Sequence, residues 1–254
     1  MRLGDDTLLA VLSDAHGNAE ALRAVLADVD ACGARALVFL GDAVGYGPDP
    51  EEVVALLRGR GASMVLGNHE DGVLHDDILP MFNPQARQNV LQTRKLLSKE
   101  TLAFLAELPT SIAAGNARFV HGCPPDDPHK YLFEITTAKL RSILHRFHER
   151  ICFVGHTHEM RVLAVPPDGA SGQGSIQRTV PGEGERYELR PDWRYVVNVG
   201  AVGQPRDGDN RAKYVLWDRA ADTLEFRRVD YDYRTTAKKI LERGFHERYA
   251  DRLL

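Results

Sequence analysis

The stretch LLAVLSDAH (Leu8–His16) decides the fold, because it joins an apolar run directly to an Asp-x-His pair. Five apolar residues in succession are typical of a strand that is buried on both faces. The apolar spacing of Ala19–Val29 predicts a helix, and the run Ala36–Leu40 predicts a second strand. A helix over Glu51–Arg58 and a strand over Met64–Leu66 continue the alternation. The beginning of the chain therefore indicates an α/β fold with parallel strands.

The later part of the chain has a different pattern. Its first expected elements are helices over Gln85–Leu97, Lys99–Leu108 and Thr137–His148, and strands over Ala117–Val120 and Ile151–Val154. The runs that follow are Arg161–Val165, Tyr195–Val199, Tyr214–Trp217 and Thr223–Val229. Because no helical spacing separates these runs, we predict a mainly antiparallel second half. A last helix is expected from Thr236 to Arg243.

The segment Pro166–Glu185 is rich in glycine and proline and has no apolar period. This composition predicts a loop or a hairpin tip that adds nothing to the core. No internal repeat and no separating linker is evident in the sequence, so we expect a single domain over residues 1–254.

Composition excludes several classes of function. A net charge of −4 and a pI of about 6.2 argue against a protein that binds long nucleic acid through its phosphates. No stretch approaches the ~20 apolar residues that span a bilayer, and the N-terminus does not resemble a signal peptide. Three cysteines without paired spacing indicate a reducing compartment, so we expect a cytoplasmic protein without a membrane partner. Nothing in the sequence fixes an oligomeric state.

Polar side chains follow five of the expected strands, at the point where each strand ends. They are Asp14 and His16, Asp42, Asn68 with His69, His121, and His156 with His158. Ligands of open α/β sheets bind beyond the carboxyl ends of the strands, so these residues should meet at one rim. Each motif alone is compatible with an ordinary turn, but five together predict a binding site.

The residue types at this rim suit a metal. Carboxylate, imidazole and amide oxygen are ligands for Mn, Fe, Zn or Co, and residues two apart in an extended segment point the same way. The remaining histidines lack such a position and are read as ordinary polar residues: His75, His129, His145, His148 and His246.

These motifs resemble the calcineurin-like metallophosphoesterase superfamily. They are Asp-x-His at Asp14, Gly41-Asp42, Gly67-Asn68-His69-Glu70, His121-Gly122 and Gly155-His156-Thr157-His158. The segments Gly41–Pro48 and Val202–Gly208 are similar to its small bacterial and archaeal phosphodiesterase branch. The resemblance implies an α/β sandwich of two mixed β-sheets flanked by helices.

The resemblance also implies two divalent transition-metal ions, with Mn preferred and Fe, Zn, Co or Ni as alternatives. Asp14, His16 and His158 would hold the first ion. Asn68, His121 and His156 would hold the second, and Asp42 would bridge both. A hydroxide shared by the two ions would attack the phosphorus. His69 would bind no metal and would stabilise or protonate the leaving oxygen.

The sequence departs from the family pattern in three places. Asn198-Val199-Gly200-Ala201 stands where the branch has Asn-Pro-Gly-Ser, so any role of that serine is absent. Cys123 replaces a common serine, and we expect a small buried residue rather than a reactive thiol. Gly45-Tyr46-Gly47 stands where protein phosphatases carry Asp-Arg-Gly, which counts against a phosphoprotein substrate.

The leading functional hypothesis is a phosphodiesterase that acts on small phosphodiesters such as cyclic or modified nucleotides. A broad-specificity phosphomonoesterase or a protein phosphatase is the alternative. A non-catalytic scaffold is disfavoured by His69 and the complete ligand set, and a nuclease is disfavoured by the charge. Tyr46 is a candidate to stack on a base and Arg206 to pair with a phosphate. Loop packing and a surface ion pair are the competing interpretations of these two residues.

Overall fold

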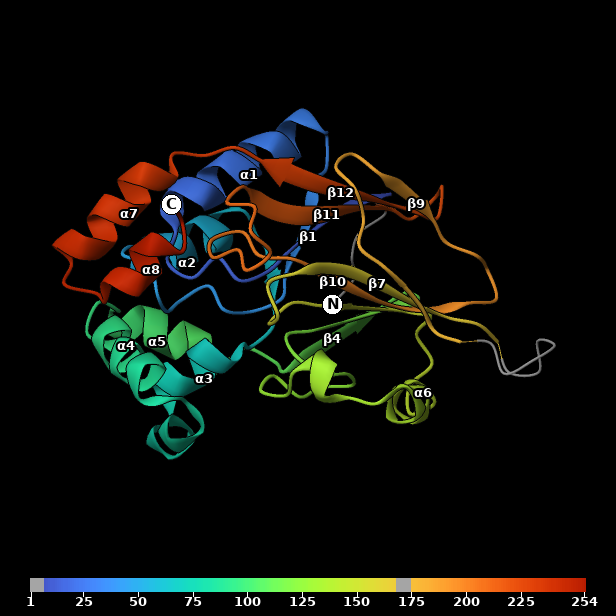
Figure 1. The fold of residues 1–254 in the computed structure, drawn as a ribbon, viewed down its shortest axis with the longest axis horizontal. Helices are drawn as coiled ribbons and strands as arrows, with labels where there is room; N and C mark the ends of the chain where they lie inside the picture. Colours follow the sequence, from blue (N-terminus) through green and yellow to red (C-terminus); the bar gives the residue numbers. More distant parts are fainter. Residues whose placement is uncertain (1–6, 168–174) are drawn as a thin grey trace.

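The structure is a computed structural model and describes residues 7–167 and 175–254. In this part of the chain, two six-stranded mixed sheets pack face to face and helices flank them (Figure 1). The predicted α/β sandwich is therefore confirmed. Residues 1–6, which bear on the signal-peptide interpretation, and Gly169, Gly172 and Gly174 of the predicted loop lie outside the described residues.

The first sheet contains the parallel strands of the beginning of the chain. Its order is β3 (Ser63–Met64), β2 (Ala36–Phe39), β1 (Leu8–Leu12), β11 (Ala212–Asp218), β12 (Thr223–Val229) and β9 (Arg186–Glu188). Strands β1, β2 and β3 run parallel, and the other neighbours are antiparallel. Leu9 and Val11 of β1 pack between the sheets, whereas Ala10 and Leu12 pack in the cluster that contains the helices. Both faces of β1 are thus buried, which explains its unbroken apolar run.

The second sheet contains the strands of the middle of the chain. Its order is β4 (Ser111–Ala114), β5 (Ala117–Val120), β6 (Ile151–Val154), β10 (Arg194–Val199), β7 (Met160–Val165) and β8 (Gln177–Thr179). Strand β6 pairs in parallel with both β5 and β10, and the other pairs are antiparallel. Phe119, Phe153 and Trp217 fill the space between the two sheets.

Most of the helices begin at a residue whose side chain caps them. They are α1 (Ala19–Ala31), α2 (Pro50–Gly59), α3 (Asn68–Leu74), α4 (Pro84–Arg94), α5 (Lys99–Ala106), α6 (Thr137–Leu144), α7 (Tyr233–Glu242) and α8 (Glu247–Asp251), with 3₁₀ turns over Asp76–Met81 and Leu132–Glu134. The side chains of Asn18, Asn83, Ser98 and Thr136 each accept a hydrogen bond from the first turn of the following helix. Such a cap is worth ~1 kcal/mol, which matters for a helix as short as α6.

The helices are distributed around the sandwich. Helix α1 lies along the first sheet, and α6 packs on the opposite side of the molecule against the second sheet (Figure 1). Helices α7 and α8 lie together near the C-terminus and the rim side of β1 (Figure 1). Among the described residues, none of the helices combines the length and the apolar character that crossing a bilayer requires.

The sequence-based boundaries are wrong in several elements. The helix expected over Gln85–Leu97 ends at Arg94, and the one expected over Thr137–His148 ends at Leu144. The loop prediction for Pro166–Glu185 is wrong at β8, which pairs with β7, and at Ile176, which is buried in the core. Strand β8 is a polar edge strand that is held by backbone pairing, so it carries no apolar alternation.

Candidate metal centre

The carboxyl ends of β1, β2, β3, β5 and β6 meet at one rim, as the sequence predicts. The loops after β1 and β2 are joined by hydrogen bonds from Asp14 N to Gly41 O (3.0 Å) and from His16 N to Asp42 O (2.9 Å). The structure brings together all seven predicted ligands and His69, and all eight are buried: Asp14, His16, Asp42, Asn68, His69, His121, His156 and His158.

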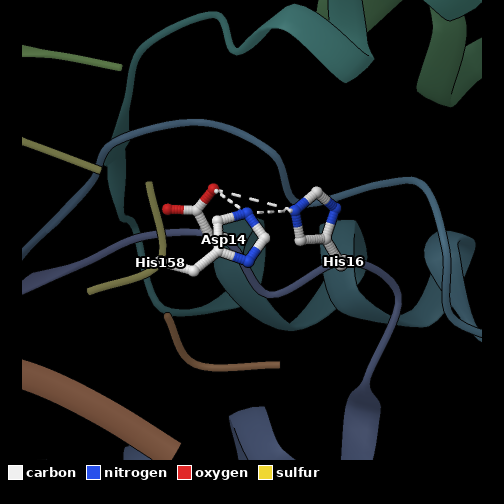
Figure 2. A group of neighbouring side chains, drawn as sticks. All are labelled: Asp14, His16 and His158. Atoms are coloured by element: carbon white, nitrogen blue, oxygen red, sulfur yellow. Dashed lines mark hydrogen bonds and ion pairs between the residues drawn. The ribbon is translucent and has the colours of Figure 1, made fainter. Parts of the chain in front are cut away.

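One group at the rim consists of Asp14, His16 and His158 (Figure 2). His158 Nε2 lies 3.2 Å from Asp14 Oδ1 and 3.2 Å from His16 Nε2. His16 Nε2 lies 3.7 Å from the same carboxylate oxygen. Figure 2 shows these atoms converging on one point from loops that are far apart in the sequence.

A second group consists of Asp42, His121 and His156. His121 Nε2 lies 3.3 Å from Asp42 Oδ2 and 3.1 Å from His156 Nδ1. The amide oxygen of Asn68 lies 3.0 Å from the same imidazole nitrogen. The four residues therefore offer nitrogen and oxygen atoms to one small volume.

Asp42 lies between the two groups. Its Oδ2 atom is 3.3 Å from His121 Nε2 and 3.6 Å from His16 Nε2, so a single oxygen reaches an imidazole of each group. Its other oxygen accepts a hydrogen bond from His69 N at 2.8 Å, which fixes the carboxylate plane.

Each imidazole of the two groups is oriented by a backbone carbonyl. His16 Nδ1 donates to Val44 O, His121 Nδ1 to Leu40 O, His158 Nδ1 to Gln204 O, and His156 Nε2 to His129 O. A carbonyl oxygen only accepts, so the nitrogen that faces it carries the proton. The opposite nitrogen of each neutral ring then presents its lone pair to the centre.

These lone pairs require a positive charge between them. Two unprotonated nitrogens that face one another at 3.2 Å, beside a carboxylate, repel unless a cation lies among them. Asp14 Oδ1 is buried and has no hydrogen-bond partner, which leaves an anionic oxygen free for a ligand bond. The residues of both groups therefore fit divalent transition-metal ions.

The backbone at the rim is strained. Asp14, His16, Asp42, His156 and His158 all have φ between 46° and 65°, in the left-handed region. This conformation costs a residue with a side chain ~1–2 kcal/mol. Such strain concentrates at functional sites, where the surrounding structure enforces it.

The electrostatics of the rim favour cations. Burial opposes a charge on His121, but Asp42 outweighs it and raises the pKa of His121 to about 9. Burial lowers the pKa of His156 to about 3 and that of His69 to about 4. The position of His121 thus attracts positive charge, which a metal ion in place of the ring's proton would supply, while His69 and His156 stay neutral.

His69 occupies the first turn of α3. Successive helical residues point about 100° apart, so Asn68 and His69 still face different directions. The His69 ring contacts His16 and Tyr46 at centroid distances of 4.8 and 4.4 Å. His16, Asp42 and His69 also form a group that could hold a metal, so the geometry alone leaves two roles for His69.

Gly45 makes room for His69. It has φ of +90°, and a Cβ atom there would lie 2.2 Å from His69 Nδ1. Any side chain at this position would displace the imidazole.

Glu70, the last residue of the Gly-Asn-His-Glu motif, also belongs to the site, although the sequence predicted no role for it. Its carboxylate accepts hydrogen bonds from Asp42 N (2.7 Å), Gly67 N (2.9 Å) and Val44 N (3.1 Å). It thereby ties the loop after β2 to the start of α3. Burial, together with the negative charge of Asp42, raises the pKa of Glu70 to about 7.

Asn198 and His129 also support the centre without having been predicted to do so. Asn198 Nδ2 donates to Gly155 O (2.7 Å) and to Thr157 Oγ1 (2.9 Å), which holds the turn that carries His156. The backbone carbonyl of His129 orients His156, whereas its side chain is an ordinary polar residue, as the sequence suggests. Its imidazole pairs with Asp71 at 2.7 Å.

The remaining candidates differ in their surroundings. Cys123 is buried, and burial raises the pKa of its thiol to about 11, which agrees with a small structural residue. The Tyr46 ring packs against His16, His69 and Tyr249, as expected for loop packing. Arg206 lines a cavity beside Tyr46 and, within the described residues, forms no ion pair.

Comparison with known proteins places this site in a family. The model of the calcineurin-like phosphoesterase superfamily domain matches residues 8–222. An uncharacterised protein of Methanocaldococcus jannaschii is 36% identical over 251 residues, with 97% of each chain covered. The crystal structure of a metallophosphoesterase from Sphaerobacter thermophilus is 36% identical, with a TM-score of 0.81 and 98% of each chain covered. A hypothetical protein from Pyrococcus horikoshii shares the fold, with 18% identity, a TM-score of 0.75 and 97% of each chain covered.

Proposed function

We propose that this chain, which belongs to the calcineurin-like phosphoesterase superfamily, is a dinuclear metal-dependent phosphodiesterase. Its substrates would be small phosphodiesters such as cyclic or modified nucleotides. The observation that carries the proposal is the position of Asp42, whose Oδ2 atom reaches an imidazole of both groups. A carboxylate between two sets of ligands is what a pair of neighbouring ions requires.

The residues divide between the two ions as follows. Asp14, His16 and His158 would hold one, Asn68, His121 and His156 would hold the other, and Asp42 would contact both. When bound, the ions would supply positive charge for the phosphoryl oxygens and lower the pKa of the attacking water. Mn is our first choice of ion, and the imidazole nitrogens and carboxylate oxygens also suit Fe, Zn or Co.

The chain's own groups would orient the reaction. The carbonyls of Leu40, Val44 and Gln204 fix the imidazoles in place before a ligand arrives, so no reorganisation is needed. His69 lies beside the same centre and would donate a hydrogen bond or a proton to the leaving oxygen.

A cavity beside the centre suits a substrate that carries an organic group on its phosphate, as a phosphodiester does. It has a volume of about 300 Å³ and is lined by Asn68 and His156 together with Tyr46, Phe82 and Tyr131. Aromatic walls next to metal ligands suit an organic substituent on the phosphate. A diester carries such a substituent on each side of the phosphorus.

The test compares two nitrophenyl esters on protein loaded with Mn²⁺. We expect a higher kcat/KM for bis(p-nitrophenyl) phosphate than for p-nitrophenyl phosphate, and loss of both activities after chelation. A preference for the monoester would overturn the diester assignment. Activity that survives complete metal removal would overturn the metal-dependent mechanism.

A further inference from the structure

A second cavity adjoins the one beside the metal centre. It has a volume of about 230 Å³. Tyr46, Asn83, Ala86 and Tyr131 line both cavities, so the two share a wall and lie next to one another. A substrate at the metal centre could therefore extend into the second cavity.

Three arginines line this second cavity, which we call the arginine pocket: Arg206, Arg248 and Arg252. Arg206 comes from the loop between β10 and β11, Arg248 from α8, and Arg252 from the C-cap of that helix. No aspartate or glutamate is among the described residues that line it. The chain as a whole carries a net charge of −4, so this concentration of positive charge is local.

The guanidinium groups of these three arginines lack the carboxylate partners that Arg211 and Arg227 have. None of the three forms an ion pair with a carboxylate in the part of the chain that the structure describes. Arg252 Nη1 donates to the side chain of Gln204 at 3.3 Å, and Arg206 Nε is buried without a hydrogen-bond partner. Burial and the nearby positive charge of Arg206 lower the pKa of Arg252. These guanidinium donors are therefore available to bind an anion.

The pocket is held in place by packing. Arg248 and Arg252 are four residues apart, so they lie on one side of α8, where two like charges destabilise an isolated helix. The helix is fixed by the buried side chains of Phe245, Tyr249 and Leu253, and Tyr249 Oη donates to Gln85 O at 3.3 Å. The unfavourable charge pair is therefore maintained on a rigid support beside the site.

We propose that the arginine pocket binds a second phosphate group of the substrate, so that the preferred substrate is a small phosphodiester carrying an additional phosphate. This inference rests on the proposed function. Guanidinium groups bind phosphate through two parallel hydrogen bonds, and a dianionic phosphate can accept from more than one of them. The adjoining walls would place that phosphate beside the aromatic cavity rather than at the metals.

The experiment uses a matched pair of chromogenic substrates on the full chain loaded with Mn²⁺. One is the p-nitrophenyl ester of thymidine 5′-phosphate, and the other is the same ester with a phosphate on the 3′ oxygen. We expect kcat/KM to be higher for the second ester by roughly tenfold or more, as charge-assisted hydrogen bonds to a phosphate provide. Arg206→Gln and Arg252→Gln should each bring this ratio toward one.

The matched control is Arg186→Gln, an exposed arginine on β9 whose ion pair with Glu225 is remote from the pocket. It should keep the ratio of the unmodified protein, and thermal unfolding of each variant reports whether it is folded. A ratio near one in the unmodified protein, with both esters hydrolysed, would overturn the inference and leave the proposed function standing. A ratio that persists in both pocket variants would also overturn it. Hydrolysis of neither ester would overturn the proposed function and the inference with it.

Discussion

The metal rim and the arginine pocket adjoin one another but hold their charges in opposite ways. At the rim, the imidazoles of the two metal-binding groups are oriented by backbone carbonyls, as His121 is by the carbonyl of Leu40. In the pocket, Arg206 and Arg248 have no ion pair within the described residues. Hydrogen bonds within the folded chain fix the side chains of the rim before a ligand binds. The pocket is held by packing instead, and its guanidinium groups remain available to bind an anion.

The difference predicts how each region responds to substitution. A change at the rim removes a group on which the ligands of two ions depend, so activity and stability should both respond strongly. A change in the pocket removes unfavourable charge, so it should alter substrate preference while leaving the fold intact.

The largest effect is expected for Asp42→Asn, because this carboxylate contacts both groups. A loss of several kcal/mol of transition-state stabilisation corresponds to ~10³–10⁵-fold in kcat. Metal analysis should find close to two equivalents per chain in the unmodified protein and fewer in the variant. Asp77→Asn, at an exposed position, is the control. Wild-type activity in Asp42→Asn would remove Asp42 from the mechanism.

The next effect is expected for His69→Ala. General acid catalysis is typically worth ~10²–10⁴-fold, so kcat should fall by that order for esters with poor leaving groups. The defect should shrink for nitrophenyl esters, which need little protonation. Metal content separates the two roles that the geometry allows: an unchanged content supports a group facing the substrate, and loss of an ion makes His69 a ligand. His75→Ala, on an exposed residue after α3, is the control.

Much of the rim could be predicted from the sequence because its signals are local. Each ligand lies within four residues after the end of a strand, and an apolar run predicts most of these strands. The support of the rim could not be predicted in this way. Glu70 acts on Asp42 and Val44, which lie 28 and 26 residues away, and no local pattern reports such a contact.

The arginine pocket could be predicted from the sequence even less than the support of the rim. Arg206 could be suggested from its motif, but Arg248 and Arg252 reach the pocket only because α8 packs beside Tyr46. Strand β8 could not be predicted because it is held by backbone pairing with β7, which requires no apolar alternation in its sequence.

A smaller effect, on stability, is expected for Glu70→Ala. The substitution leaves three buried N–H groups without their acceptor, and each unpaired donor costs ~1–3 kcal/mol. Water that enters the space will satisfy part of this demand, so the free energy of unfolding should fall by about 3–5 kcal/mol. Urea unfolding of metal-free protein measures it, with the exposed Glu100→Ala as control. A change below ~1 kcal/mol would show that Glu70 does not hold the rim together.

The smallest effect contrasts an arginine that forms an ion pair, Arg211, with Arg252, which forms none within the described residues. Asp209 accepts hydrogen bonds from Arg211, the shortest at 2.7 Å, and these lower the pKa of Asp209 to about 2 despite partial burial. A carboxyl group whose pKa is lower in the folded chain stabilises it when ionised. This contribution is fully present above the unfolded value near 3.8 and is lost as the pH falls toward 2.

Asp209→Asn should therefore lower the free energy of unfolding by up to ~1 kcal/mol at pH 7, since the pair is partly exposed to solvent. It should also flatten the loss of stability between pH 4 and pH 2. Arg252→Gln should do the opposite and leave stability equal or slightly higher, because it relieves repulsion from Arg206. Urea titrations of both variants at pH 7 and of Asp209→Asn across the acid range measure these differences. If Arg252→Gln destabilised the fold as Asp209→Asn does, the hydrogen bond from Arg252 to Gln204 would be structural. The distinction between a rim oriented by hydrogen bonds and a pocket of arginines available to an anion would then no longer hold.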